Sequence, residues 1–358
     1  MTRPPALWDP EAFRGRVRAE LDRFVDEQAG RLAPLGEDAA RLVDAARDAV
    51  AGGKRLRAAF CHWGFRAVTA DVPDERALLR ADASLELLHA SALVHDDYMD
   101  ASDTRRGRPA THKAFESAHR EQGWRGDPEQ YGAAAAILLG DLLLSWSDEL
   151  LRTCGLDHGR VRDALACFDT TRTEVVTGQF LDVSVQARGA SDVAQAMTVL
   201  RYKSAKYSVE RPLHVGAALA GGSADVRAAL SDFGLPLGEA FQLRDDLLGV
   251  YGDPEATGKP AGDDLTEGKR TVLVALALES APADDAARLD AALGRPLGVA
   301  EVAGLRRIID ASGAHAEVEH RIDVLTTQAL AALDAAPVTD VARAVLRELA
   351  DAATRRAG

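Results

Sequence analysis

Apolar side chains recur along this chain every three to four residues, which is the spacing of one face of an α-helix. This spacing predicts amphipathic helices over residues 13–25 and 39–50, and a buried helix over the mostly apolar segment 83–94. Longer helices are expected over residues 74–100, 133–151, 160–187 and 192–220, separated by breaks rich in Gly, Pro and Asp. No strand-like alternation interrupts them. We therefore predict an all-α protein.

The composition agrees with close-packed helices. Of the 358 residues, 47% are hydrophobic but only 5% are aromatic, whereas a β-sandwich or barrel would carry more aromatic and β-branched residues. The chain is long enough for one large domain or two ordinary ones. We predict a single domain over residues 1–358, with residues 1–10 as a flexible tail. The part beyond residue 271 is interpreted as helical scaffold, notably over residues 300–311 and 316–335.

Charge and cysteine content exclude several classes of protein. A net charge of −13 argues against a nucleic-acid binder, which needs a basic surface. Cys61, Cys154 and Cys167 are odd in number and lack metal-binding spacing, so we expect free thiols. The first residues hold no apolar signal core, and no apolar stretch has the length of a membrane span. The sequence therefore predicts a cytoplasmic protein with no stable membrane insertion.

The densest chemistry lies in residues 93–111, which read LVHDDYMDASDTRRGRPAT. Asp96 and Asp100 are one helical turn apart and project from nearly the same face, whereas Asp97 points to the side. Two carboxylates in this arrangement suit Mg²⁺, which keeps waters and accepts phosphate oxygens as ligands. Fork-shaped phosphate donors follow in a segment broken by Gly and Pro, where a loop could fold back over a cavity: Arg105, Arg106 and Arg108.

This segment also has a purely structural interpretation. Asp pairs are common at solvated helix ends, and Arg pairs are usually surface charge. The apolar helix that precedes the carboxylates favours a site, because side chains that continue a buried helix line a cavity.

A basic segment, GGKRLR, covers residues 52–57. Lys54 and Arg57 are one turn apart at the start of an apolar run, where the backbone amides of a new helix would add to an anion site. Taken alone, the segment is more typical of a glycine helix stop followed by a solvated basic turn.

Polar residues also mark one face of an otherwise apolar helix, at a spacing of three or four: Glu174, Gly178, Gln179 and Asp182. The helix that follows carries Arg201, Lys203, Ser204 and Lys206. Lys203 and Ser204 either face a phosphate and a developing positive charge or are solvated helix residues. The pattern leaves both interpretations open.

A second acidic cluster lies within residues 241–271. Asp245 and Asp246 continue an apolar helix, and Lys259 and Lys269 follow in a segment rich in Gly and Pro. Carboxylates followed by cations repeat the order of the first cluster. Two such helices indicate a cavity in which metal ions are held from opposite walls.

Five motifs, taken in order, resemble the signatures of the all-trans polyprenyl diphosphate synthases, prenyltransferases with the class I isoprenoid synthase fold. They are GGKRLR at residues 52–57, HDDYMDASDTRRGRP at 95–109, GQFLD at 178–182, KSAKY at 203–207, and FQLRDD from residue 241 with its continuation GKPAGDDLTEGK. The resemblance covers nearly the whole chain. It implies a helical bundle around a deep central cavity, usually assembled as a homodimer.

The resemblance also implies a role for each matching residue. Asp96 and Asp100 would bind two Mg²⁺ ions and Asp245 a third, all bridging the allylic diphosphate. The cations implied to hold or approach that diphosphate are Arg105, Lys203, Lys259 and Lys269. The residues implied to bind isopentenyl diphosphate are Lys54, Arg57, His89 and Arg106. The cavity lining would include Gln179, Asp182, Gln242 and Ser204, the last standing where the family usually has Thr.

The implied reaction requires no protein nucleophile, which fits the absence of any Ser/His/Asp or Cys/His constellation. Metal ions and cations take up the charge of the departing diphosphate, so that the allylic C–O bond ionises. The isopentenyl double bond then attacks the carbocation inside a dry apolar cavity. One position departs from the family, because Gly249 stands where many members carry a third carboxylate. Candidates for outer contacts in its place are Asp253, Asp263 and Asp264.

The resemblance further implies that the side chains before Asp96 set the product length. Ser91 and Ala92 are small where farnesyl-producing members typically place an aromatic residue, so the next side chain that could stop the growing tail is Leu88. This favours geranylgeranyl diphosphate, with geranylfarnesyl, hexaprenyl or farnesyl diphosphate as alternatives. Rivals of other classes are a class I terpene cyclase and a non-catalytic regulatory paralogue. Two Asp-Asp motifs, few aromatics and a full set of cationic anchors weigh against both.

Overall fold

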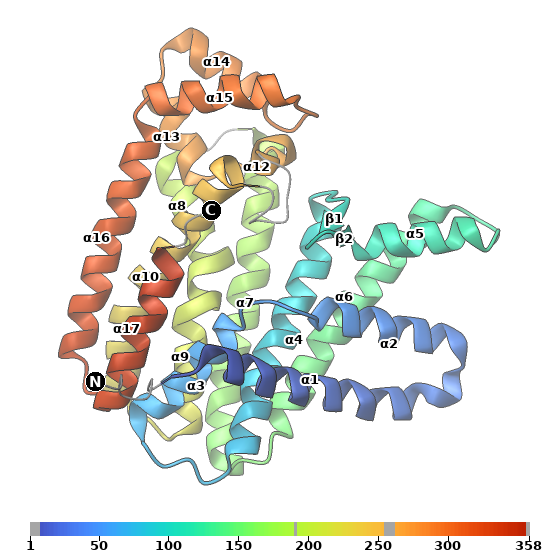
Figure 1. The fold of residues 1–358 in the computed structure, drawn as a ribbon, viewed down its shortest axis with the longest axis vertical. Coiled ribbons are helices and arrows are strands. Elements are labelled where there is room, and N and C mark those ends of the chain that lie inside the picture. The colour runs from blue at the N-terminus through green and yellow to red at the C-terminus, as the bar shows by residue number, and fades with distance from the viewer. Residues whose placement is uncertain (1–7, 190–191, 254–261, 356–358) are drawn as a thin grey trace, which may run out of the picture. The chain divides into compact units, whose positions relative to one another are not determined.

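The computed structural model describes residues 8–189, 192–253 and 262–355, and Figure 1 traces its elements. The helices of the first half are α1 (Pro10–Leu32), α2 (Glu37–Val50), α3 (Leu56–Val68), α4 (Glu75–Met99), α5 (Thr111–Glu121), α6 (Pro128–Arg152) and α7 (His158–Arg188). Those of the second half are α8 (Val193–Leu200), a π-helix (Arg201–Glu210), α9 (Arg211–Leu219), α10 (Ala224–Tyr251), α12 (Asp263–Glu267), α13 (Val272–Ser280), α14 (Ala283–Ala292), α15 (Val299–Ala311), α16 (Ala314–Ala335) and α17 (Asp340–Thr354).

The all-α prediction is confirmed. Within the described residues, the exceptions are a 3-10 turn at Ala33–Leu35 and a hairpin of two short strands, β1 (Thr104–Arg105) and β2 (Arg108–Pro109). The helix predicted over residues 74–100 is α4, and the helix predicted over 160–187 is α7. The segment predicted as one α-helix over residues 192–220 is helical but changes to π geometry in its middle.

The chain is held in place from Trp8 onward. Asp9 caps α1, because its Oδ1 accepts 3.0 Å hydrogen bonds from the backbone N–H groups of Glu11 and Ala12. The Trp8 ring packs against Phe13 and Trp63, with centroids 4.8 and 5.4 Å apart. Of the predicted flexible tail, residues 1–7 lie outside the described residues. Residues 8–10 carry a helix cap and an aromatic contact, and the flexible tail stays a prediction.

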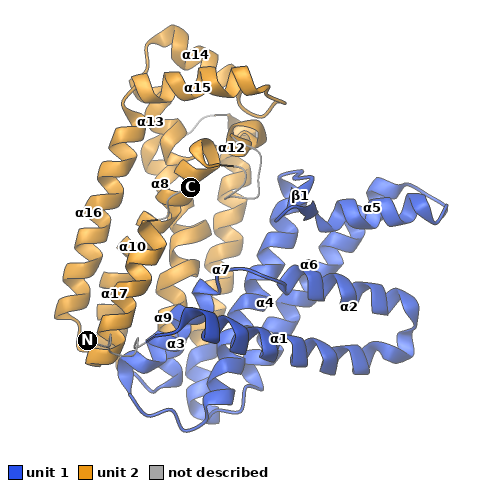
Figure 2. Ribbon diagram, in the orientation of Figure 1, with its two compact units in different colours: residues 1–165, 215–222 blue, residues 166–214, 223–358 orange. Residues whose placement is uncertain are grey.

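The chain divides into two compact units, shown in Figure 2. Unit 1 contains the chain up to Leu165 and Val215–Gly222, and unit 2 contains Ala166–His214 and the chain from Ser223. The single domain over residues 1–358 stays a prediction.

In unit 1, α4 packs against α6, α3 and α1, and α5 packs against α6. Close approach is possible because glycines lie at the crossings. A Cβ at Gly140 of α6 would be 2.0 Å from His95 Nε2 on α4. A Cβ at Gly216 of α9 would be 1.9 Å from the carbonyl oxygen of Cys61 on α3. The acidic end of α4 is therefore fixed by the packing of its neighbours.

In unit 2, α10 packs against α16 and the π-helix, and α13 packs against α16 and α8. Their buried faces form one apolar core that includes Leu243, Leu247, Leu273, Ile309 and Val318. Helices α13–α16 contribute to this core, and α17 packs against α10 and α16, whereas their role as scaffold stays a prediction.

The three cysteines are free thiols, as predicted. Burial raises the pKa of Cys61 well above its usual value and also raises that of Cys154. None of the helices in the described ranges combines the length and apolar character needed to cross a membrane.

Candidate active site

The first acidic cluster closes α4. The backbone N–H of Asp100 still donates to the carbonyl of Asp96 at 2.8 Å, so both residues belong to the last helical turn, and both are half-buried. Asp97, between them, is buried, and its Oδ1 accepts a 2.8 Å hydrogen bond from Nε of Arg105. Asp97 therefore serves to hold an arginine, whereas Asp96 and Asp100 share one end of the helix.

The segment that carries the three arginines is the β1–β2 hairpin, which folds against the glycine turn before α3. Arg106 donates to the carbonyl of Ala51, and a Cβ at Gly53 would lie only 3.2 Å from Arg106 Nη2. Glycine is therefore needed at this turn for the guanidinium to approach. Arg108 is exposed and pairs with Asp48 at 2.8 Å, which separates it from the candidate phosphate donors.

Arg55 has a structural role that the sequence did not reveal. It is buried, donates to Glu86 Oε2 at 3.1 Å and also donates to the carbonyl of Val50. These bonds hold the GGKRLR turn between α2 and α4. In the sequence Arg55 is one of three cations in this segment, and only the buried carboxylate of Glu86 on another helix distinguishes it.

Positive charge gathers around His89 on α4. Burial lowers the pKa of His89 well below its usual value, and nearby cations lower it further, in decreasing order Arg57, Arg106, Arg105 and Arg55. A neutral imidazole among guanidinium groups favours an anion. Three of the four residues implied to bind isopentenyl diphosphate thus lie together in unit 1. The fourth, Lys54, is exposed at the same turn.

The residues implied to set product length lie on α4 before the acidic end. Leu88 and Ser91 are buried and Ala92 is half-buried. The role of these three residues in product length stays a prediction.

In unit 2, the π-helix is approached closely by two other helices. A Cβ at Gly178 of α7 would lie 2.4 Å from the backbone nitrogen of Lys203. A Cβ at Gly238 of α10 would lie 2.4 Å from the carbonyl oxygen of Ala205. The motifs GQFLD and KSAKY, separate in the sequence, are therefore two sides of one helix contact.

The same contact brings Lys203 to Asp182. Lys203 Nζ lies 2.6 Å from Asp182 Oδ2, and Asp182 is buried. Ser204 and Gln179, from the two helices in contact, are half-buried. Lys203 is thus fixed at the contact, which does not fit the solvated interpretation left open by the sequence.

The second acidic cluster pairs an exposed carboxylate with a buried one. Asp245 is exposed. Burial, together with the charges of Asp264 and Asp245, raises the pKa of Asp246 to about 8. Gln242, implied as part of the cavity lining, donates from Nε2 to Asp246 Oδ1 at 2.8 Å. Gln242 therefore holds the buried carboxylate.

The departure at Gly249 has a structural reason. A Cβ at Gly249 would lie 1.9 Å from Oδ2 of Asp264, so the carboxylate of α12 fills the space where a side chain of α10 would stand. Lys269 Nζ lies 3.5 Å from Asp264 Oδ1 and 2.5 Å from Glu267 Oε2. Lys259, implied to hold the diphosphate, lies outside the described residues.

Helices that end in paired carboxylates, with cations fixed beside them and apolar packing behind, define an isoprenoid synthase of class I. Comparison with known proteins makes this specific. The family model described as polyprenyl synthetase matches residues 39–309. The chain therefore belongs to the polyprenyl synthetase family, and it is a polyprenyl diphosphate synthase.

Individual relatives agree with this. The chain is 36% identical over 244 residues to a short chain isoprenyl diphosphate synthase of Methanothermobacter thermautotrophicus, covering 68% of this chain and 69% of the relative. It is 34% identical over 234 residues to a geranylfarnesyl diphosphate synthase of Aeropyrum pernix, covering 64% and 68%. A crystal structure of geranylgeranyl pyrophosphate synthase from Corynebacterium glutamicum, complexed with isoprenyl diphosphate and magnesium, shares 42% identity and a TM-score of 0.95 over 98% of this chain and 100% of that chain.

Proposed function

We propose that the enzyme condenses isopentenyl diphosphate with an allylic diphosphate, head to tail, and releases geranylgeranyl diphosphate. The observation that carries the proposal is the group of arginines near His89, whose positive charges lower its pKa, on the same helix that ends in Asp96 and Asp100. A diphosphate is the ligand that both the cations and the metal-binding carboxylates require.

Mg²⁺ is the proposed metal, with three ions per site. Within the described residues, no three His, Cys, Asp or Glu side chains form a group that could hold an ion by themselves. An ion bound by Asp96 and Asp100, or by Asp245, would therefore complete its coordination with water and diphosphate oxygens, as Mg²⁺ does. When bound, the metal neutralises the charge of the leaving diphosphate.

The side chains divide between two substrates. Lys54, Arg57, His89 and Arg106 anchor isopentenyl diphosphate, so that its double bond is held for attack. The groups that receive the allylic diphosphate and its charge are Arg105, Lys203, Lys259 and Lys269. Ser204, Gln179 and Gln242 face the reacting end of the substrate. After attack at the allylic carbon, loss of a proton from the isopentenyl unit restores a double bond.

The product length is proposed from the buried Leu88 and from the small Ser91 and Ala92. Relatives named for geranylgeranyl and geranylfarnesyl products support a tail that passes Ser91. The test is incubation of the purified protein with Mg²⁺, labelled isopentenyl diphosphate and dimethylallyl, geranyl or farnesyl diphosphate. We expect a twenty-carbon product as the main one; no elongation from any primer would refute the function.

We also propose a homodimer in the cytoplasm. On α7, Val176, Phe180 and Val183 lie at helical spacing and are 61%, 69% and 37% exposed. On α6, Ile137 and Leu138 are 46% and 60% exposed. Apolar stripes of this kind usually mark an interface. Sedimentation at micromolar concentration should give a dimer, and Phe180→Glu should shift the protein toward monomer.

A further inference from the structure

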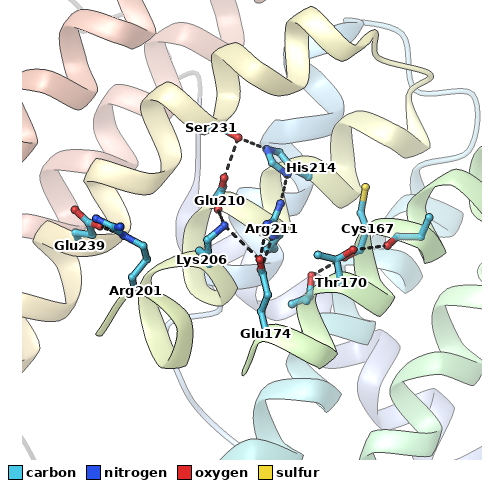
Figure 3. A network of polar contacts seen from close by, with 12 residues as sticks. Cys167, Thr170, Glu174, Arg201, Lys206, Glu210, Arg211, His214, Ser231 and Glu239 are labelled. Carbon is cyan, nitrogen blue, oxygen red and sulfur yellow. Dashed lines mark hydrogen bonds and ion pairs between the residues drawn. The ribbon is translucent and has the colours of Figure 1, made fainter. Parts of the chain in front are cut away.

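Six side chains of unit 2 form a closed ring of polar contacts, drawn in Figure 3. Arg211 donates to both oxygens of Glu174 at 2.7 Å, and Lys206 Nζ lies 3.3 Å from Glu174 and 3.1 Å from Glu210. Ser231 donates to Glu210 at 2.9 Å, and His214 lies 2.9 Å from Ser231. The ring closes because Arg211 lies 3.1 Å from Nδ1 of His214.

The hydrogen-bond directions in the ring are determined by its members. Arg211 can only donate, so Nδ1 of His214 accepts and Nε2 carries the proton. Ser231 gives its single proton to Glu210, so its oxygen can only accept from Nε2–H of His214 at 2.9 Å, a proton that is shared with the carbonyl of Arg227 at 3.1 Å. The lowered pKa of His214, about 4 because of burial, agrees with a neutral imidazole. The donors and acceptors of the six side chains are therefore consistent with a single set of hydrogen bonds.

The ring is buried and balanced in charge. The side chains of Glu174, Arg211, Lys206 and Glu210 are between 6% and 16% exposed, and two carboxylates offset two cations. Buried ion pairs of this kind add little net stability compared with apolar residues of the same volume. Their directional bonds do fix how neighbouring helices are aligned.

The helices aligned by the ring are those that present Lys203. On α7, Glu174 contacts Lys206, Gly178 meets the backbone of Lys203, and Asp182 binds Lys203 Nζ. These three positions are spaced by four and lie along one face. The ring therefore lies at one end of the contact between α7 and the π-helix, and Lys203 is held at the other end.

The π-helix between them needs support from outside. π geometry is rare and occurs mostly as short insertions at functional sites. Here Lys206 and Glu210 join it to α7 and α10 through the ring, and Arg201, at its first residue, pairs with Glu239 of α10 at 2.6 Å. The first residue of the π-helix is therefore tied to α10 by an ion pair, and its second half is tied to α7 by the Lys206–Glu174 ion pair and to α10 by the hydrogen bond from Ser231 to Glu210.

We propose that the closed ring of Glu174, Lys206, Glu210, Arg211, His214 and Ser231 is a positioning device, which sets the register between α7 and the π-helix and so directs Lys203 and Ser204 at the allylic diphosphate. The inference rests on the proposed function. The six residues of the ring do not contact the substrate. They act through the π-helix, which carries Lys203 and Ser204.

The test uses a double variant that removes the bidentate pair without leaving a buried charge unpaired, Glu174→Leu with Arg211→Met. Its melting temperature should stay near that of the wild type, because the replacement is apolar and balanced. The KM for the allylic substrate should rise between about tenfold and a hundredfold, because a displacement of about 1 Å at the reacting groups has this cost. The KM for isopentenyl diphosphate should change by less than about threefold. Binding of farnesyl thiodiphosphate with Mg²⁺, measured by calorimetry, should weaken in parallel.

Two further variants separate position from stability. Ser231→Ala opens the ring without changing its charge, and it should shift the same KM in the same direction by a smaller factor. Arg343→Met is the control: Arg343 donates to the carbonyls of Asp334, Ala336 and Val338 near the start of α17, without contacting the π-helix. This control should melt earlier but keep both KM values.

The two proposals fail differently. An inactive wild-type protein would refute the proposed function. An active wild type, together with ring variants whose two KM values and analogue affinity are unchanged, would overturn the positioning role and leave the ring as a structural feature. Equal rises in both KM values would overturn it as well.

Discussion

The two acidic clusters are similar in composition, but their carboxylates are brought together in different ways. At the end of α4, the carboxylates of Asp96 and Asp100 come from the last turn of one helix and its C-cap. At the end of α10, Asp245 and Asp246 are followed by Gly249, and the carboxylate above that glycine is Asp264 from α12. The first cluster is encoded locally, whereas the second is completed by tertiary structure.

The cations differ in the same way. In unit 1, arginines come from a hairpin that packs on a glycine turn, and a neutral histidine lies among them. In unit 2, Lys203 is held by a buried carboxylate and by two close helix crossings. Cations that anchor a substrate need only lie close to one another. A cation that acts at the reacting end of a substrate must also be held in one orientation. This difference is consistent with the proposal that unit 1 anchors isopentenyl diphosphate and that Lys203 receives the departing diphosphate.

The largest effects are expected from the carboxylates that we propose bind metal ions. Asp96→Ala and Asp245→Ala should each lower turnover by about a thousandfold or more, because metal stabilisation of the leaving group contributes several kcal/mol. Helical content measured by circular dichroism should not change, since neither side chain is buried. Near-normal turnover of either variant at saturating Mg²⁺ would remove that residue from the metal site.

The next effect separates the substrates. Lys54→Ala should raise the KM for isopentenyl diphosphate, and Lys203→Ala the KM for the allylic substrate, each by about ten- to a hundredfold, as expected for a lost bond to a charged group. Steady-state kinetics with each substrate varied in turn gives both values. Arg108→Ala, which loses only an exposed pair with Asp48, is the control. The reverse selectivity would exchange the two sites.

A smaller effect tests the tertiary origin of the second cluster. Asp264→Ala should lower turnover by about tenfold, the loss expected for an outer contact to a metal site. Gly249→Asp alone should also be impaired, because its Cβ would collide with Asp264. The combined variant Gly249→Asp/Asp264→Ala moves the carboxylate onto α10 and should recover most of the lost turnover. If the combined variant were worse than both single ones, Asp264 would not replace a residue at position 249.

The smallest effect concerns product length and leaves turnover nearly intact. Ser91→Phe places a ring where the tail is expected to pass, and it should shorten the main product by at least one isoprene unit. Chromatography of the dephosphorylated products measures this. Ala90→Val is the control, because Ala90 is a buried neighbour on the same helix. An unchanged distribution in the Phe variant would show that the tail avoids this face.

Much of the fold was predictable because helical periodicity is a local property. The helix expected over residues 74–100 is α4 (Glu75–Met99), and Asp97 was correctly separated from Asp96 and Asp100 by the helical angle alone. The change to π geometry at Arg201–Glu210 was not predictable, because its residue pattern remains that of an α-helix. It depends on glycines of α7 and α10 that are remote in the sequence.

The parts of the site that escaped prediction are all contacts between distant segments. In the sequence Arg55 does not differ from the cations beside it. Its structural role follows only from its contact with Glu86. Asp264 was a candidate for an outer contact. Its position directly above Gly249 could not be predicted, because that position depends on the path of the chain between the two residues. His89 would have been taken for a core histidine without the family motif, and only the surrounding arginines distinguish it.

The central claim, that carboxylates from both clusters act on one diphosphate through metal ions, is tested most directly by a crystal structure with Mg²⁺, isopentenyl diphosphate and farnesyl thiodiphosphate. The account predicts three ions with oxygen ligands at about 2.1 Å. Asp96 and Asp100 should hold two of them and Asp245 the third, with Lys203 on the same diphosphate. A bound analogue whose ions touch only one of the two clusters would contradict the account.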